Sequence, residues 1–211
     1  MDTRQKILDT ALQLFNEKGY TEVGVREIAR AMNISPGNLS YHFSKKEDMF
    51  FELLKHYSQN NDQNFNQFFV GEATLERYLN MMWNMLSSQY KYRGIFIAFS
   101  YFFKEIQKGD RLDYAQTYTK REHSIRGILS QLHEAQQIRV EAPDIEFLFA
   151  FLSLFGRFSI QEAFMLDRTR KETGFLHHYL TMLTYQMSLF ATEKGKNSID
   201  DFRQKYLMQQ K

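Results

Sequence analysis

Helical periodicity without a competing strand signal is the feature that most constrains this chain of 211 residues. Apolar residues recur throughout at the 3.6-residue spacing of amphipathic helices, and no stretch alternates steadily between apolar and polar residues. Proline, which interrupts helices, occurs only twice. The sequence therefore predicts an all-α fold.

Composition and the lengths of the apolar segments exclude several classes of protein. The chain has no cysteine, which excludes disulfides, thiolate nucleophiles and thiolate-bound zinc or iron–sulfur clusters. Its first residues lack the basic and then apolar layout of a secretory signal. The longest apolar stretches, 94–103 and 147–156, are about half as long as the roughly 20 residues that a membrane-spanning helix needs. We therefore expect a cytoplasmic protein that does not contact a membrane.

Two helices are predicted before residue 33. The first carries an apolar stripe from Ile7 to Phe15 and ends at Gly19, since glycine readily adopts the left-handed conformation of a helix C-terminus. The second covers 25–32, and Asn33 after it can also turn the chain in the left-handed region.

Two further helices follow a strong start signal at Ser35 and Pro36, because serine caps free amides and proline suits the first helical position. The helix that begins there runs to His42. Ser44 and Glu47 then fit a capping box, which predicts a fourth helix extending toward Phe69. Glycines and a proline divide the rest of the chain into helices expected near 74–92, 95–107, 111–137, 143–168, 173–193 and 198–209.

The second and third helices have the lengths and the short connection of a helix-turn-helix, whose second helix enters the major groove of DNA. Overall charge does not indicate DNA binding, because the formal net charge is +2 and residues 1–56 hold eight basic and eight acidic side chains. The helix at 36–42 does indicate DNA binding. It combines small residues, which let a backbone approach base edges, with an asparagine that can bind adenine. Lys45 and Lys46 stand beside it at a helix N-terminus, where phosphate binds well.

From Arg4 to Leu54 the chain resembles the DNA-binding domain of tetracycline-repressor-like (TetR) regulators. Three segments carry the resemblance: Ile7-Leu8-x-x-Ala11-x-x-Leu14-Phe15-x-x-x-Gly19-Tyr20, Val25-Arg26-Glu27-Ile28-Ala29, and Ser35-Pro36-Gly37-Asn38-Leu39-Ser40-Tyr41-His42-Phe43-Ser44-Lys45-Lys46-Glu47. The resemblance implies a three-helix head, which we assign to residues 1–46, and a helical domain at 47–211 that binds a small ligand and dimerises. It also implies a repressor that leaves its operator when the ligand binds.

Carried over by position, the resemblance gives groove contacts at Asn38, Tyr41 and His42, and phosphate contacts at Ser35, Tyr41 and Lys46. The whole predicted DNA-binding set is Arg26, Ser35, Pro36, Gly37, Asn38, Ser40, Tyr41, His42, Lys45 and Lys46. Ser40 and Gly24 depart from the family pattern, which often has tyrosine and a hydroxyl residue at these positions. The operator is therefore harder to predict than the fold.

A helical enzyme or ligand carrier is the competing class, and a non-specific nucleoid protein is a second alternative. The sequence has no glycine-rich phosphate loop, no nucleophile elbow and no Glu-x-x-His pair of a di-iron bundle. Its histidines lack metal-ligand spacing, and neighbours such as His177 and His178 point about 100° apart on a helix. We predict neither a catalytic site nor a metal or cofactor.

A homodimer is expected because apolar residues surround the helix from Phe147 to Phe158, and such a helix must be covered on more than one side. Two helices from each chain would form a four-helix bundle and set the recognition helices about 34 Å apart on a pseudo-palindromic operator. A monomeric core is the alternative. The predicted interface residues are Phe151, Phe155, Phe158, Leu176, Tyr179, Leu183, Met187 and Phe190.

The predicted effector site combines apolar walls with a single charge. Glu122 falls in the core stripe of its helix, and Arg157 is the nearest matching cation in another apolar helix. In one interpretation Glu122 reaches solvent or pairs with an arginine; in the other, Glu122 or Arg157 orients a largely apolar ligand. The predicted lining is Trp83, Phe96, Phe99, Phe102, Tyr118, Glu122, Leu152 and Arg157.

Overall fold

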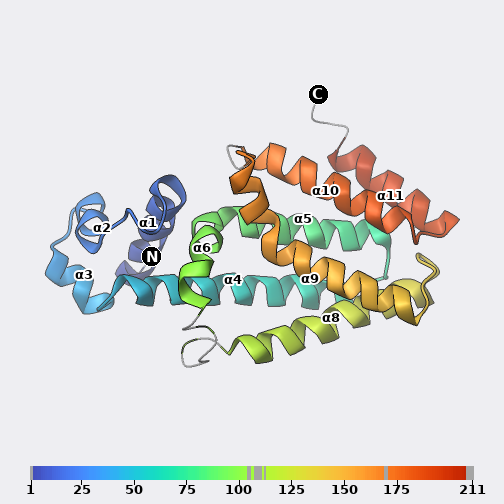
Figure 1. Ribbon diagram of the computed structural model, residues 1–211, viewed down its shortest axis with the longest axis horizontal. Helices are drawn as coiled ribbons and strands as arrows, with labels where there is room; N and C mark the ends of the chain where they lie inside the picture. Colours follow the sequence, from blue (N-terminus) through green and yellow to red (C-terminus); the bar gives the residue numbers. More distant parts are fainter. Residues whose placement is uncertain (1, 104–105, 107–110, 112, 169–170, 208–211) are drawn as a thin grey trace. The chain divides into compact units, whose positions relative to one another are not determined.

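A computed structural model describes residues 2–103, 106, 111, 113–168 and 171–207, and these residues contain helices, turns and one isolated bridge but no strand (Figure 1). The N-terminal helices are α1 (Thr3–Lys18), α2 (Val25–Ala31), α3 (Pro36–His42) and α4 (Lys46–Phe69). The later elements are α5 (Leu75–Lys91), α6 (Arg93–Ala98), the 3-10 helix η1 (Phe99–Phe102), α8 (Tyr114–Glu134), α9 (Ala142–Met165), α10 (Glu172–Ser188) and α11 (Glu193–Tyr206). The predicted all-α fold is confirmed.

The chain forms two compact units, and the first is built from two separate segments. Met1–Asn60 and Lys91–Tyr114 make the first unit, while Asn61–Tyr90 and Ala115–Lys211 make the second. The first unit therefore extends beyond the predicted boundary at residue 46.

An aromatic cluster lies at the centre of the first unit. The ring of Tyr20 packs against Phe15, Phe50 and Phe102, with ring centroids 5.1, 5.6 and 5.2 Å away. Phe102 also stacks on Phe50, with ring centroids 4.0 Å apart. The 3-10 helix thus contributes to the same core as α1 and α4.

A tight helix contact joins α6 to the end of α1. A Cβ atom added to Gly94 would lie 2.6 Å from the carbonyl carbon and oxygen of Phe15, so only glycine fits without movement. The side chain of Asn16 donates to the carbonyl of Lys91 at 2.8 Å and accepts from the amide of Gly94 at 2.8 Å. Asn16 therefore bridges the last residue of α5 and the first turn of α6.

The second unit packs its helices along their lengths, with α8 beside α9 and α10 beside α11 (Figure 1). Its interior includes a polar network in which Gln89 donates to the carbonyl of Gly156 at 2.6 Å and accepts from Ser159 at 2.8 Å. At the other end of α5, the amide of Leu75 donates to the side chain of Gln137 at 3.0 Å. These bonds hold α5 to α9 and to the turn after α8.

Several predicted boundaries in the second half need correction. The helix predicted at 95–107 becomes α6 followed by a 3-10 turn, and residues 104–105 and 107 lie outside the described part of the chain. The helix predicted at 173–193 ends at Ser188, and α11 starts five residues earlier than 198. The reason is that the Thr192 hydroxyl accepts from the Gly195 amide at 3.2 Å, which caps α11 at that point.

Helix α9 also differs from expectation. It has 24 residues and contains an 18-residue window with a mean hydropathy of 1.3, so its length and composition alone would let it cross a membrane. Of that window, 33% is buried inside the protein. The expectation that no segment is long enough was wrong, because it counted only unbroken apolar runs. Among the described residues, α9 is the single helix that is long and apolar enough to cross a membrane.

Candidate nucleic-acid interface

Helices α2 and α3 and their connection form the predicted helix-turn-helix. Asn33 has φ +54°, which confirms the left-handed turn expected there. The Ser35 side chain accepts from the Asn38 amide at 3.1 Å, and Pro36 follows at the first helical position. The start of α3 is therefore set by the local signals that the sequence predicted.

Helix α3 attaches to the unit through its apolar side chains. Leu39 is fully buried and Phe43 nearly so, and the Arg4 guanidinium lies 4.6 Å from the centroid of the Phe43 ring. The other face of the helix is exposed, and the Tyr41 side chain is 87% accessible. The exposed predicted contacts on this face are Ser35, Pro36, Gly37, Asn38, Ser40 and Tyr41. His42 is half-buried, with its ring against the edge of Tyr41.

Gly37 has no structural need for a missing side chain. A Cβ atom there would meet only the Ser35 hydroxyl at 3.9 Å, and the backbone does not adopt positive φ. No contact within the chain therefore explains why this residue is glycine. A glycine here would allow the backbone of α3 to approach base edges.

The predicted cations differ in their surroundings. Arg26 on α2 and Lys45 at the α3–α4 corner are exposed. Lys46 is half-buried, and its ammonium donates to the carbonyl oxygens of Tyr20 and Val23 at 2.7 and 2.8 Å. The structure thus gives Lys46 an internal contact that the sequence did not predict.

The capping box predicted from Ser44 and Glu47 is wrong, since Asp48 takes that place. One oxygen of Asp48 accepts from the Ser44 hydroxyl at 2.9 Å and from the Lys45 amide at 3.0 Å. Its other oxygen lies 3.1 Å from the Arg111 guanidinium. Burial raises the pKa of Asp48, but these donors outweigh it and hold the pKa below its usual value. Asp48 and Arg111 were missed because they are 63 residues apart in sequence.

The residues predicted to line an effector site separate between the two units. Phe96 packs edge-on against Tyr57, Phe102 belongs to the aromatic cluster, and Phe99 contacts Phe103 and Tyr114, all in the first unit. The second unit holds the remaining five, which are Trp83, Tyr118, Glu122, Leu152 and Arg157.

Within the second unit, the Trp83 ring lies against Tyr206 and the Leu152 side chain is buried. The Arg157 guanidinium lies 5.6 Å from the centroid of Tyr118. Glu122 accepts a hydrogen bond from Arg126 at 3.0 Å. This agrees with the interpretation in which Glu122 pairs with an arginine of its own chain.

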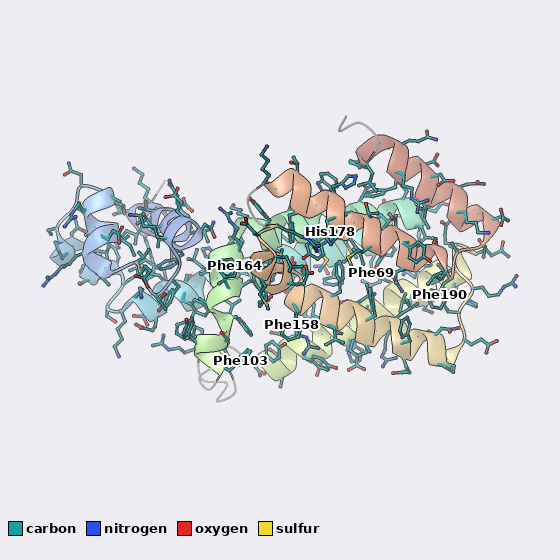
Figure 2. The ribbon with its side chains drawn as sticks, turned by 45° about the horizontal axis from the view of Figure 1, so that its top comes forward. Phe69, Phe103, Phe158, Phe164, His178 and Phe190 are labelled. Carbon is teal, nitrogen blue, oxygen red and sulfur yellow. The ribbon has the colours of Figure 1, made fainter. Side chains whose placement is uncertain are left out.

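The predicted dimer residues also fall into two groups. Leu176, Tyr179, Leu183 and Met187 are covered by their own chain, so they are not available to a partner and their assignment needs correction. Phe151, Phe155 and Phe190 are half-buried, and Phe158 is 49% exposed. Figure 2 shows Phe158 and Phe164 on α9, with His178 on α10.

Exposed apolar side chains that the prediction omitted continue this face. On α9 they are Phe147, Leu154 and Met165, and on α10 they are Met182 and Tyr185, with Leu189 directly after it. Phe164 of α9 is also exposed but lies on another side of the helix. Periodicity placed Leu176, Leu183 and Met187 on one stripe of α10 without showing that the chain itself covers that stripe.

No group of three metal-ligating side chains occurs among the residues that the structure describes. The ring nitrogen Nδ1 of His123 lies 2.9 Å from the Thr119 carbonyl on the same helix.

Comparison with known proteins addresses the same region. The family described as "Bacterial regulatory proteins, tetR family" matches residues 7–53, which include α2, α3 and the start of α4. A regulator from Marinobacter aquaeolei VT8, solved as a TetR-family transcriptional regulator, superposes with a TM-score of 0.81 at 25% identity, covering 98% of this chain and 99% of that one. Residues 7–53 therefore match the DNA-binding domain of the TetR family, and the whole chain is similar to a TetR-family regulator.

Two curated relatives agree with this assignment. The probable HTH-type transcriptional regulator YttP of Bacillus subtilis is 26% identical over 160 residues, which is 73% of this chain and 75% of YttP. IcaR of Staphylococcus aureus, named as a negative transcriptional regulator of a biofilm operon, is 38% identical over 52 residues, or 25% of this chain and 28% of IcaR. The protein is a DNA-binding transcriptional regulator with a TetR-type head.

Proposed function

We propose that this regulator represses transcription by binding a pseudo-palindromic operator as a homodimer, and that a small, largely apolar ligand releases it. The observation that carries the DNA part is α3, which buries Leu39 and leaves its small and polar residues exposed. We propose repression because IcaR, which is 38% identical to this chain over 52 residues, is named as a negative transcriptional regulator. The proposal includes a cytoplasmic location, where a regulator meets the chromosome, and no enzymatic activity.

Selection of bound sequences from random DNA tests this proposal. Enrichment of an inverted repeat with half-sites about one helical turn or a multiple of it apart is expected. If the protein binds all sequences equally and no motif is enriched, the result would instead support the alternative of a non-specific nucleoid protein.

The dimer part rests on the exposed seam of α9. Phe147, Phe151, Leu154, Phe158 and Met165 recur at intervals of four, three, four and seven residues, which places them along one side of a helix. Met182 and Tyr185 of α10, followed by Leu189, repeat the pattern. Patches of this kind on one chain indicate a protein interface, and a two-fold axis would cover both helices.

The effector part rests on a charge that no described carboxylate neutralises. Arg126 pairs with both Glu122 and Glu146, with closest distances of 3.0 and 2.7 Å. Arg157 is half-buried over Tyr118, donates through Nε to the Ser153 carbonyl at 3.0 Å, and has no carboxylate partner among the described residues. Of the two charges predicted, Arg157 is therefore the one we assign to ligand binding.

A ligand screen read by thermal stabilisation tests the effector, since binding to the folded state raises the melting temperature. A hit should also dissociate the operator complex. Compounds that stabilise the protein without releasing DNA would contradict the proposed release.

A further inference from the structure

Two adjacent lysines at the α3–α4 corner have different surroundings. Lys45 is exposed, whereas Lys46 is half-buried. The ammonium of Lys46 donates to the carbonyls of Tyr20 and Val23 and lies 4.1 Å from the centroid of the Tyr20 ring. The two cations are thus not equivalent candidates for the same contact.

The contacts of Lys46 use most of its bonding capacity. An ammonium group has three donors and no acceptor, and two of the donors are directed at carbonyls inside the first unit. The aromatic face of Tyr20 adds a cation–π contact. Burial lowers the pKa of Lys46, and the neighbouring Glu47 and Glu22 oppose that effect without cancelling it. A phosphate could therefore contact Lys46 only through its one remaining donor, or by removing it from these partners.

These bonds close the helix-turn-helix at its base. Val23 lies just before α2, and Lys46 is the first residue of α4 after α3. A bond between them joins the two ends of the segment that contains both helices. Tyr20 in turn packs into the aromatic cluster with Phe15 and Phe50. Lys46 therefore ties the segment that presents α3 to the core of the first unit.

We propose that Lys46 is a positioning residue that sets the placement of α3, and that Lys45 makes the phosphate contact at this corner. The proposal rests on the DNA interface proposed above. It departs from the expectation, drawn from family resemblance, that Lys46 contacts phosphate.

Three single variants of the full-length protein separate the two roles: Lys46→Met, Lys46→Arg and the matched control Lys45→Met. Each is titrated with the selected operator over a range of salt. Lys46→Met removes the bonds and keeps the aliphatic chain, while Lys46→Arg keeps a charge that could reach phosphate but cannot occupy the same compact contact. We expect both to weaken operator binding by about tenfold with the salt slope unchanged. Lys45→Met should flatten that slope by about one unit.

Wild-type affinity of Lys46→Arg, together with a flattened salt slope in Lys46→Met, would overturn the proposal. A measurement on the unmodified protein covers the case in which Lys46→Met does not fold. The NMR signal of the Lys46 ammonium should be protected from exchange in the free protein and should stay in place when operator is added, while that of Lys45 should move. A large shift of the Lys46 signal alone would also overturn it. If Asn38→Ala and Lys45→Met both bind like wild type, the proposed DNA interface itself is wrong.

Discussion

Helices α3 and α9 both leave much of their surface uncovered by their own chain, but with opposite chemistry. On α3 the buried side is apolar, and the exposed side carries Asn38, Ser40 and Tyr41. On α9 the exposed side is itself apolar, with Leu154 57% and Phe158 49% accessible. Exposed polar groups on α3 are satisfied by water, whereas each large apolar side chain gains roughly 1.5–3 kcal/mol on full burial. The contrast supports the proposed polar partner for α3 and the proposed apolar cover for α9.

The largest effect should come from breaking the α9 seam. Phe158→Glu places a charge among the exposed phenylalanines, so we expect a monomer by light scattering. Because two linked half-site contacts gain about 10²–10⁴ in affinity over one, operator binding should fall by at least about a hundredfold. Phe164→Glu is the matched control, since Phe164 is equally exposed on the same helix but off the seam. A Phe158→Glu protein that stays dimeric would place the interface elsewhere.

Changes on α3 should affect DNA without affecting the dimer. Asn38→Ala should cost roughly 1–3 kcal/mol in operator affinity and relax the preference at one base pair, as measured by repeating the sequence selection. Unchanged preference at every position would remove Asn38 from base recognition.

Gly37→Ala sharpens the same comparison, because nothing in the chain opposes the added methyl group. The melting temperature should hold or rise, since alanine is a better helix former by about 0.8–1 kcal/mol. Operator affinity should fall if the backbone lies close to the bases. Equal affinity for the two proteins would show that α3 does not approach DNA at this point.

The two charges predicted for the effector site should now behave differently. Arg157→Ala should weaken the ligand found by screening about tenfold, the effect of losing one hydrogen bond to a charged group. Glu122→Gln should leave ligand affinity unchanged, because Glu122 is bonded to Arg126. Isothermal titration measures both, and the reverse order of effects would return Arg157 to a structural role.

The smallest effect concerns the ion pair between α8 and α9. Hydrogen bonds from Arg126 lower the pKa of Glu146. A carboxyl group with a lowered folded-state pKa stabilises the protein above its unfolded pKa, and this contribution is lost as pH falls through the folded value. Wild type should therefore melt slightly higher than Glu146→Gln at neutral pH, and the difference should disappear in acid. A difference that persists in acid would mean that the pair contributes through packing.

Local signals predicted the head well, while contacts distant in sequence escaped prediction. Gly19, Asn33 and the Ser35–Pro36 pair act on the backbone beside them, so the end of α1 and both ends of α2 and α3 were predicted to within a residue. The partners of Lys46 lie 23 and 26 residues away, and no local pattern reports them. Periodicity on α10 likewise gave the stripe containing Leu183 without showing that its own chain covers it.

The contact of Gly94 with the backbone of Phe15 bears on how such proteins can be recombined. The first unit takes α1 to the first half of α4 from one part of the gene, and α6 with η1 from another. A single crossover placed between codons 60 and 91 would join a head from one parent to an α6 from the other. In the hybrid, Gly94 would have to pack against the α1 of the other parent, and Phe102 against the residue that the other parent has at position 50. Exchanging operator specificity between relatives therefore requires two crossovers, or a graft restricted to the surface of α3.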